Sequence, residues 1–219
     1  MICATGISPE SLLTGKERSF YSQRMSKGQA TKLAILDEAV GIASRIGFNA
    51  LTIGQLAEQT GMSKSGLFAH FKSKEALQLE TLERGRERFT DIVMRPTLTA
   101  PRGIQRVRAL MENWLVWETE ALAGGCVFVT ASVEFDDQPG PLRDALVRNQ
   151  TDWAETIATV VRTAISEGDF RADVDVDQFA FAMLGLFYAF HHTSRLLKDP
   201  GALTRLKAGF EQLVTDASA

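Results

Sequence analysis

The sequence TIGQLAEQTGMSKSGLFAHF, residues 52–71, decides the fold that we predict for the N-terminal third of the chain. It holds two short runs in which apolar residues recur every three or four positions, and Gly61 between them permits a tight turn. Both runs can therefore pack into one small core, to which they contribute Ile53, Leu56, Ala57, Leu67 and Phe71. This pattern indicates a helix-turn-helix, a motif whose second helix enters the major groove of DNA.

Hydroxyl side chains stand where the predicted helices of this region begin. Thr52 precedes the first run, Ser63 precedes the second, and Ser73 precedes the helix that follows. Such side chains accept a hydrogen bond from a backbone N–H of the first helical turn and so mark helix starts. After Ser63 the second helix begins with Lys64 and Ser65, whose ammonium and hydroxyl groups suit phosphates and base edges.

The rest of the chain is helical by the same criterion, and strand-like alternation persists nowhere in the sequence. Gly47 ends the helix before the motif, because glycine accepts the left-handed conformation of a C-cap. The expected helices cover residues 31–46, 53–59, 64–70, 74–91, 101–122, 126–136, 142–167, 177–198 and 202–215. The predicted fold is all-α, with an N-terminal three-helix helix-turn-helix domain and a C-terminal helical bundle.

Residues 31–77 resemble the DNA-binding domain of the tetracycline repressor (TetR) family without a gap. The resemblance is carried by ILDEA at 35–39, GFNALT at 47–52, LAEQTGMSKS at 56–65 and LFAHFKSKEAL at 67–77. It implies a second, helical domain that binds a ligand and dimerises. It also implies DNA contacts from Thr52, Ser63, Lys64, Ser65, Gly66, Phe68, His70 and Lys74. The family usually has tyrosine at Phe68 and often a second aromatic at Ala69, so a hydroxyl that would reach a phosphate is missing here.

Three segments follow from this layout. Residues 1–26 are predicted to be a flexible N-terminal tail, residues 27–75 the helix-turn-helix domain, and residues 76–219 the effector-binding and dimerisation domain. The tail lacks steady periodicity and is either an arm, whose basic residues could touch DNA, or an over-extended start, since Met25 could itself begin the protein.

Aromatic residues of the second domain are candidates for the ligand pocket that the resemblance implies. A cavity for an apolar or amphipathic small molecule needs large apolar side chains with a few polar tips, although a packed core needs the same residues. The effector-binding candidates are Trp114, Trp117, Phe128, Phe135, Phe187 and His191.

The segment 177–198 is apolar on nearly all sides. Such a helix must be covered all round, and a second copy of the chain can cover the side that its own domain leaves open. Together with helix 202–215 it predicts a homodimer interface containing Phe181, Gly185, Ala189, Leu206 and Phe210. A central helix in a monomeric bundle is the alternative interpretation.

Charge is distributed unevenly along the chain. Residues 1–90 hold 12 Lys and Arg against 9 Asp and Glu, whereas residues 91–219 hold 12 against 18. A basic first part on an acidic body favours phosphate contact at one end. The longest apolar run, residues 179–190, is shorter than the roughly 20 residues that span a bilayer. With no signal-peptide core and only two cysteines, we expect a cytoplasmic protein without membrane contact.

The sequence indicates no catalytic residue, cofactor or metal site. The neighbours His191 and His192 would point about 100° apart on a helix, and the acidic run 169–177 lacks the glycine and terminal glutamate of a calcium loop. Cys126 is either a thiol sensor or a buried core residue. Our hypothesis is a ligand-responsive repressor that binds a pseudo-palindromic double-stranded DNA operator as a homodimer. The alternative is a helical ligand-binding protein or enzyme whose first helices only pack.

Overall fold

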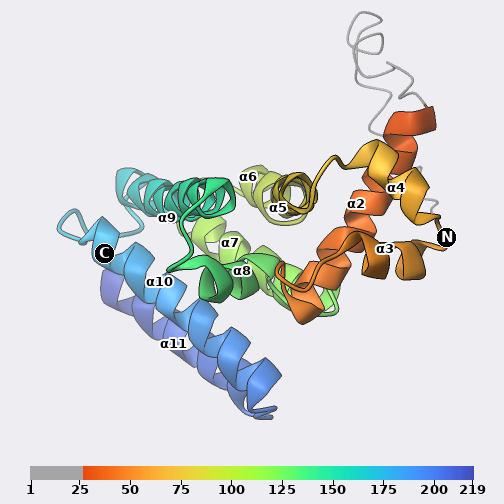
Figure 1. The fold of residues 1–219 in the computed structure, drawn as a ribbon. Helices are drawn as coiled ribbons and strands as arrows, with labels where there is room; N and C mark the ends of the chain where they lie inside the picture. Colours follow the sequence, from red (N-terminus) through yellow and green to blue (C-terminus); the bar gives the residue numbers. More distant parts are fainter. Residues whose placement is uncertain (1–26) are drawn as a thin grey trace, which may run out of the picture. The chain divides into compact units, whose positions relative to one another are not determined.

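The computed structural model describes residues 27–219, and the predicted tail, residues 1–26, lies outside the described residues (Figure 1). The described chain is helical, and its one β-type pairing is an isolated bridge between Phe170 and Ser218. This confirms the all-α prediction. The chain divides into two compact units, of which the second runs from Ile35 to Ala219 and contains all the contacts analysed below.

Four helices make up the N-terminal region: α2 (Lys27–Ile46), α3 (Ile53–Thr60), α4 (Lys64–His70) and α5 (Lys74–Phe89). The three predicted N-caps are confirmed. The caps accept backbone N–H groups at 3.0–3.2 Å, in the pairs Thr52 with Gln55, Ser63 with Gly66 and Ser73 with Ala76. Gly47 and Gly61 have φ angles of 85° and 68°, so both turns adopt the left-handed conformation that glycine tolerates.

Helix α2 is shared between two hydrophobic cores. One side of the helix packs into a small core with residues of α3, α4 and the start of α5: Ile35, Leu36, Ala39, Ile42, Leu51, Leu56, Ala57, Leu67, Phe71 and Leu77. Its other side, through Val40 and Ala43, joins the large core of the following helices, as does Phe48. Helix α5 also contributes Leu82 and Phe89 to the large core, so it packs with both groups of helices. The predicted domain boundary after residue 75 stays a prediction.

The second half of the chain consists of helices of differing length. After α6 (Arg95–Thr99), they are α7 (Ile104–Val116), α8 (Val127–Phe135), α9 (Pro141–Ser166), α10 (Val176–His191) and α11 (Ala202–Ala217). Helices α5, α7 and α10 continue into π-helical turns at residues 90–94, 117–121 and 192–196. Helices α10 and α11 run side by side (Figure 1). No helix within residues 27–219 is both long enough and apolar enough to cross a membrane.

The prediction that the helix from Lys74 ends at Asp91 was wrong. A π-helical turn, residues 90–94, joins α5 directly to α6. In this turn the Arg95 N–H bonds the Thr90 carbonyl five residues back, and the wider turn precedes Pro96, whose ring would clash with a carbonyl in a regular helix. The helix therefore continues across the proline to Thr99.

The loop before α8 touches α2 through its backbone. A Cβ atom at Gly124 would lie 1.9 Å from the Ser44 carbonyl oxygen, and the Gly124 N–H donates to Ser44 Oγ at 3.2 Å. Only glycine fits at this position. This contact fixes the end of α2 against the loop that leads into α8.

Replacing Gly124 with alanine tests this close approach. We expect Gly124→Ala to lower the free energy of unfolding by about 3 kcal/mol, because the new methyl group would overlap backbone atoms that cannot move aside. The matched control is Gly41→Ala, inside α2, where nothing lies within 4 Å of the added Cβ. This change should raise the free energy of unfolding by about 0.5–1 kcal/mol. Urea unfolding followed by circular dichroism measures both, and equal stabilities would contradict the packing described here.

Candidate nucleic-acid interface and ligand cavity

Helix α4 presents its N-terminus and one side to solvent. Ser63, Lys64 and Ser65 are exposed, and 57% of the Phe68 surface is accessible. The opposite side of α4 is anchored by Leu67, which is fully buried in the small core. A short helix that is held from behind and exposes hydroxyl, ammonium and aromatic groups has the arrangement that a recognition helix requires.

The other predicted DNA-binding residues lie in this helix or in the segments next to it. Thr52 and Lys64 lie close together, since a Cβ at Gly54 would be 3.7 Å from Thr52 Oγ1 and 3.9 Å from Lys64 Cε. Gly66 is half-buried and donates to the Ser63 cap. His70, also half-buried, places its ring 6.2 Å from that of Phe71.

Lys74 is exposed but already engaged. Its Nζ donates to the Asn49 carbonyl at 2.6 Å, which ties the start of α5 to the turn before α3. An ammonium has three N–H groups, so two remain for a phosphate. The DNA contacts of these residues stay predictions.

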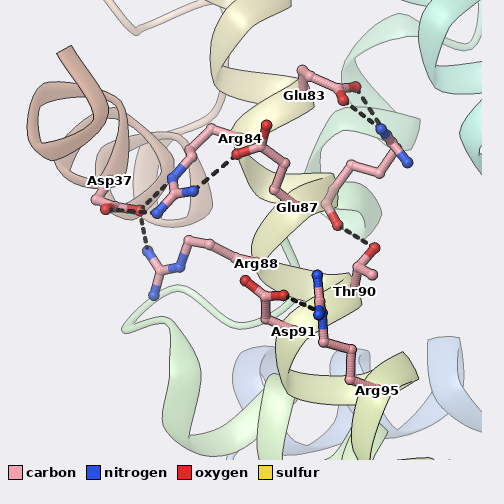
Figure 2. Close-up of polar contacts among 9 residues, drawn as sticks. Asp37, Glu83, Arg84, Glu87, Arg88, Thr90, Asp91 and Arg95 are labelled. Carbon is pink, nitrogen blue, oxygen red and sulfur yellow. Dashed lines mark hydrogen bonds and ion pairs between the residues drawn. The ribbon is translucent and has the colours of Figure 1, made fainter. Parts of the chain in front are cut away.

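An ion-pair cluster joins α2 to α5 (Figure 2). Asp37 accepts two hydrogen bonds from Arg84, from Nε at 2.9 Å and from Nη2 at 3.0 Å, and Arg88 Nη1 lies 3.7 Å away. Arg84 also pairs with Glu87 at 2.9 Å. These hydrogen bonds, Asp37 first, raise the pKa of the Arg84 guanidinium above its usual value. Sequence reasoning missed the cluster, although Arg84 and Arg88 lie four residues apart on one helix face.

A carboxylate from α8 holds the turn between α2 and α3. Glu134 Oε2 accepts the N–H groups of Phe48 at 2.7 Å and Asn49 at 3.2 Å. The buried amide of Gln78 donates to the Phe48 carbonyl at 2.7 Å from the other direction. The turn that leads into the helix-turn-helix is therefore fixed by α5 and α8 together, and no local sequence pattern pointed to these contacts.

Three of the predicted effector-binding residues meet at one cavity. Trp114, Phe128 and Phe187 line it, and the same cavity is bordered by residues that sequence reasoning did not propose, among them Phe89, Trp153 and Tyr188. Its volume is about 30 Å³. Residue type and helical spacing identified aromatic candidates in the sequence, but only the fold shows which of them border this cavity.

The other three candidates do not border this cavity, and an effector-binding role for them stays a prediction. Trp117 is fully buried behind the cavity and packs against Phe128 with ring centroids 6.1 Å apart. Phe135 packs edge-to-face on Phe48 at 6.3 Å. His191 places Nδ1 2.8 Å from Glu118 Oε1 and does not border the cavity.

Glu118 is a buried carboxylate that organises the loop before α8. Besides His191, it accepts the Cys126 N–H at 2.8 Å. Burial, and to a smaller extent the Glu118 charge, raise the pKa of the Cys126 thiol to about 11. The thiol is therefore protonated at neutral pH, which favours a core residue over a sensor. Within residues 27–219 no three His, Cys, Asp or Glu side chains gather as a metal site.

The predicted dimer residues separate into two groups. Phe181, Gly185 and Ala189 are exposed on α10, and 72% of the Phe181 surface is accessible. Leu206 and Phe210 are buried in the chain's own large core, so their prediction as partner-facing residues is corrected. The amphipathic face of α11 that carries them packs inward, because α10 and the neighbouring helices already cover it.

Comparisons with known proteins cover both halves of the chain. Residues 35–81 match the family described as bacterial regulatory proteins, tetR family, and residues 103–210 match the tetracyclin repressor-like, C-terminal domain. A crystal structure of a TetR transcriptional regulator from Chloroflexus aurantiacus is similar over 87% of this chain and 96% of its own, with a TM-score of 0.77 and 26% identity.

Two curated proteins are similar over shorter stretches. The HTH-type transcriptional regulator RutR of Escherichia coli K12 is 42% identical over 55 residues, which is 25% of this chain and 26% of RutR. The HTH-type transcriptional repressor KstR of Mycolicibacterium smegmatis is 31% identical over 121 residues, 51% of this chain and 58% of KstR. The chain thus spans about a quarter of the first relative and somewhat over half of the second.

Substitution of Arg84 tests whether the Asp37 cluster holds α2 against α5. We expect Arg84→Ala to lower the free energy of unfolding by about 1 kcal/mol or more, because a bidentate and partly buried pair is lost. Arg95→Ala, which breaks an exposed pair with Asp91 in the same helical stretch, should cost less than about 0.5 kcal/mol. Denaturant titration measures the free energy of unfolding of both variants. Equal losses would show that Asp37 and Arg84 interact no more strongly than a surface pair.

Proposed function

Because this chain belongs to the tetracycline repressor (TetR) family of transcriptional regulators, we propose that it is a ligand-responsive repressor that binds a pseudo-palindromic operator as a homodimer. The observation that carries the proposal is the exposed N-terminus of α4, with Lys64 beside Thr52 and Leu67 fully buried behind it. The family consists of transcriptional regulators and not of enzymes. Because such a regulator acts on the chromosome, we place it in the cytoplasm.

In the proposed complex, α4 lies in the major groove and its first residues contact bases and backbone. Ser63, Lys64, Ser65 and Gly66 provide these contacts, while phosphates are bound by Thr52, His70 and the free N–H groups of Lys74. Phe68 has no hydroxyl, so its ring packs against sugar or a thymine methyl group. Two such helices in a dimer would be spaced roughly 34 Å apart, one turn of DNA.

The effector is proposed to act through a population shift. A ligand in the aromatic cavity would favour a conformation in which the two recognition helices no longer fit one DNA turn. To relieve repression substantially it must bind that conformation more tightly by a few kcal/mol. Contacts of α8 support such coupling, since the helix carries Phe128 at the cavity and Glu134 at the α2–α3 turn.

The DNA-binding proposal is tested at Lys64. We expect Lys64→Ala to weaken binding to all sequences and to lower the slope of log affinity against log salt by about one unit, because one phosphate contact is lost. Lys207→Ala, which removes the same charge from an exposed site on α11, should leave both unchanged. Gel shifts at several salt concentrations, on DNA enriched by selection from the genome, measure the slope. If the wild type showed no preference over random DNA, the proposed function would be wrong.

The homodimer is tested at Phe181. A charge at the centre of an apolar interface remains poorly solvated, so Phe181→Glu should convert the dimer to monomers at micromolar concentration. Leu98→Glu, which introduces the same change at an exposed leucine on α6, should remain dimeric. Size-exclusion chromatography with light scattering gives the mass of each, and a dimeric Phe181→Glu variant would exclude this face of α10 from the interface.

A further inference from the structure

The chemistry of the cavity lining limits what can bind there. Six aromatic rings border the cavity: Phe89, Trp114, Phe128, Trp153, Phe187 and Tyr188. The remaining lining residues are Cys126, Val129, Leu184 and two amides, and none of the lining side chains is Asp, Glu, Lys, Arg or His. A bound anion would thus find no counter-charge, and an unpaired negative charge in such a site costs several kcal/mol. A cation can be attracted by aromatic faces, so the arrangement of the rings decides whether one fits.

Three of the rings lie nearly parallel. Trp114 stacks on Phe187 with centroids 3.8 Å apart and planes inclined by 12°. Trp153 is inclined by 16° to Phe187, but its centroid lies 6.2 Å away. A flat ring stacked between two parallel faces needs them roughly 7 Å apart, about twice a van der Waals contact, so a modest separation of Trp153 from Phe187 would admit one by stacking. Phe89 is nearly perpendicular to Trp153 and Phe128, but it packs edge-to-face on both, with centroids 4.9 and 5.8 Å away, so these rings leave no open cage between them for a tetrahedral ammonium group.

Polar groups are confined to one part of the lining. The Asn149 and Gln150 amides are adjacent on α9, and Gln150 Nε2 donates to Asn149 Oδ1 at 3.0 Å. Among the described residues, the Asn149 amide nitrogen has no hydrogen-bond acceptor, so it can donate to a bound molecule. The Tyr188 hydroxyl bonds Gln150 Oε1 at 3.4 Å, a long hydrogen bond.

We infer that the effector is a flat, uncharged ring compound bearing an oxygen acceptor, such as a hydroxyl or carbonyl group, that enters between Trp153 and Phe187 and accepts from Asn149. The inference rests on the proposed function in treating the bound molecule as an effector. The cavity of about 30 Å³ must widen to admit a ring. Tyr188 is the side chain placed to move, because 39% of its surface is exposed and its hydrogen bond is long.

Three probes that share one ring separate the alternatives: 2-naphthol, 2-naphthoate and 2-naphthyltrimethylammonium. Calorimetric titration into the full-length protein near neutral pH gives each affinity. We expect 2-naphthol to bind at least about tenfold more tightly than either charged probe. The three tryptophans of the chain are Trp114, Trp117 and Trp153, so protein labelled with ¹⁵N-tryptophan gives three indole signals. Those of the two lining residues, Trp114 and Trp153, should shift most.

Asn149→Ala provides the residue-level test, since this half-buried position loses only an amide. Affinity for 2-naphthol should fall about fivefold, whereas affinity for naphthalene, which has no oxygen, should be unchanged. Gln105→Ala removes an amide from an exposed site on α7 and should alter neither. The inference is overturned if a charged probe binds as tightly as 2-naphthol, if no probe binds, or if Asn149→Ala behaves like Gln105→Ala.

These titrations contain no DNA, so their outcome does not depend on whether the chain binds an operator. Selective operator binding without any probe binding would overturn the cavity chemistry alone. Probe binding by a protein that shows no preference for any genomic sequence would leave the cavity chemistry supported and overturn the regulator.

Discussion

Helix α2 has to fill two hydrophobic cores at once, and the arrangement of the remaining helices depends on that constraint. Its Ile35, Leu36, Ala39 and Ile42 side chains pack with the helix-turn-helix, while Val40 and Ala43 pack with the second half of the chain. Each buried aliphatic side chain contributes about 1.5–3 kcal/mol. Neither core can therefore be lost without weakening the other, and α4, the proposed recognition helix, is held on a support that the second half of the chain shares.

Local features of the chain were predictable because they depend on neighbouring residues. The caps at Thr52, Ser63 and Ser73 and the turn at Gly61 follow from hydrogen bonds and backbone angles within four residues. Contacts such as Glu134 with Phe48, 86 positions apart, leave no periodic signal. Periodicity also shows that a residue is buried without showing its neighbours. Leu206 and Phe210 were accordingly assigned to a partner when they pack inside the chain, and Trp117 to a pocket that it supports from behind.

The surface of α4 that is proposed to face DNA has few polar groups that are free of internal hydrogen bonds. Ser63 and Ser65 share a contact of 3.1 Å between their hydroxyl oxygens, one of which is also the helix cap, so neither hydroxyl is entirely free. Lys74 is partly used by the Asn49 carbonyl. With Phe68 lacking a hydroxyl, the Lys64 ammonium makes no hydrogen bond within the described residues, and it lies next to Thr52, whose hydroxyl caps α3.

The Glu134 contact limits how much free energy it can itself transmit between the turn before α3 and the later helices. It consists of two hydrogen bonds from backbone N–H groups to one carboxylate oxygen, and a bond to a charged group contributes about 1.5 kcal/mol or somewhat more. Losing both in one conformation would destabilise that conformation by roughly 3 kcal/mol, which corresponds to a change of about 150-fold in an equilibrium constant. If the chain responds to a ligand as proposed, this one carboxylate could account for a change of that size, and a larger change would need additional contacts to break with it.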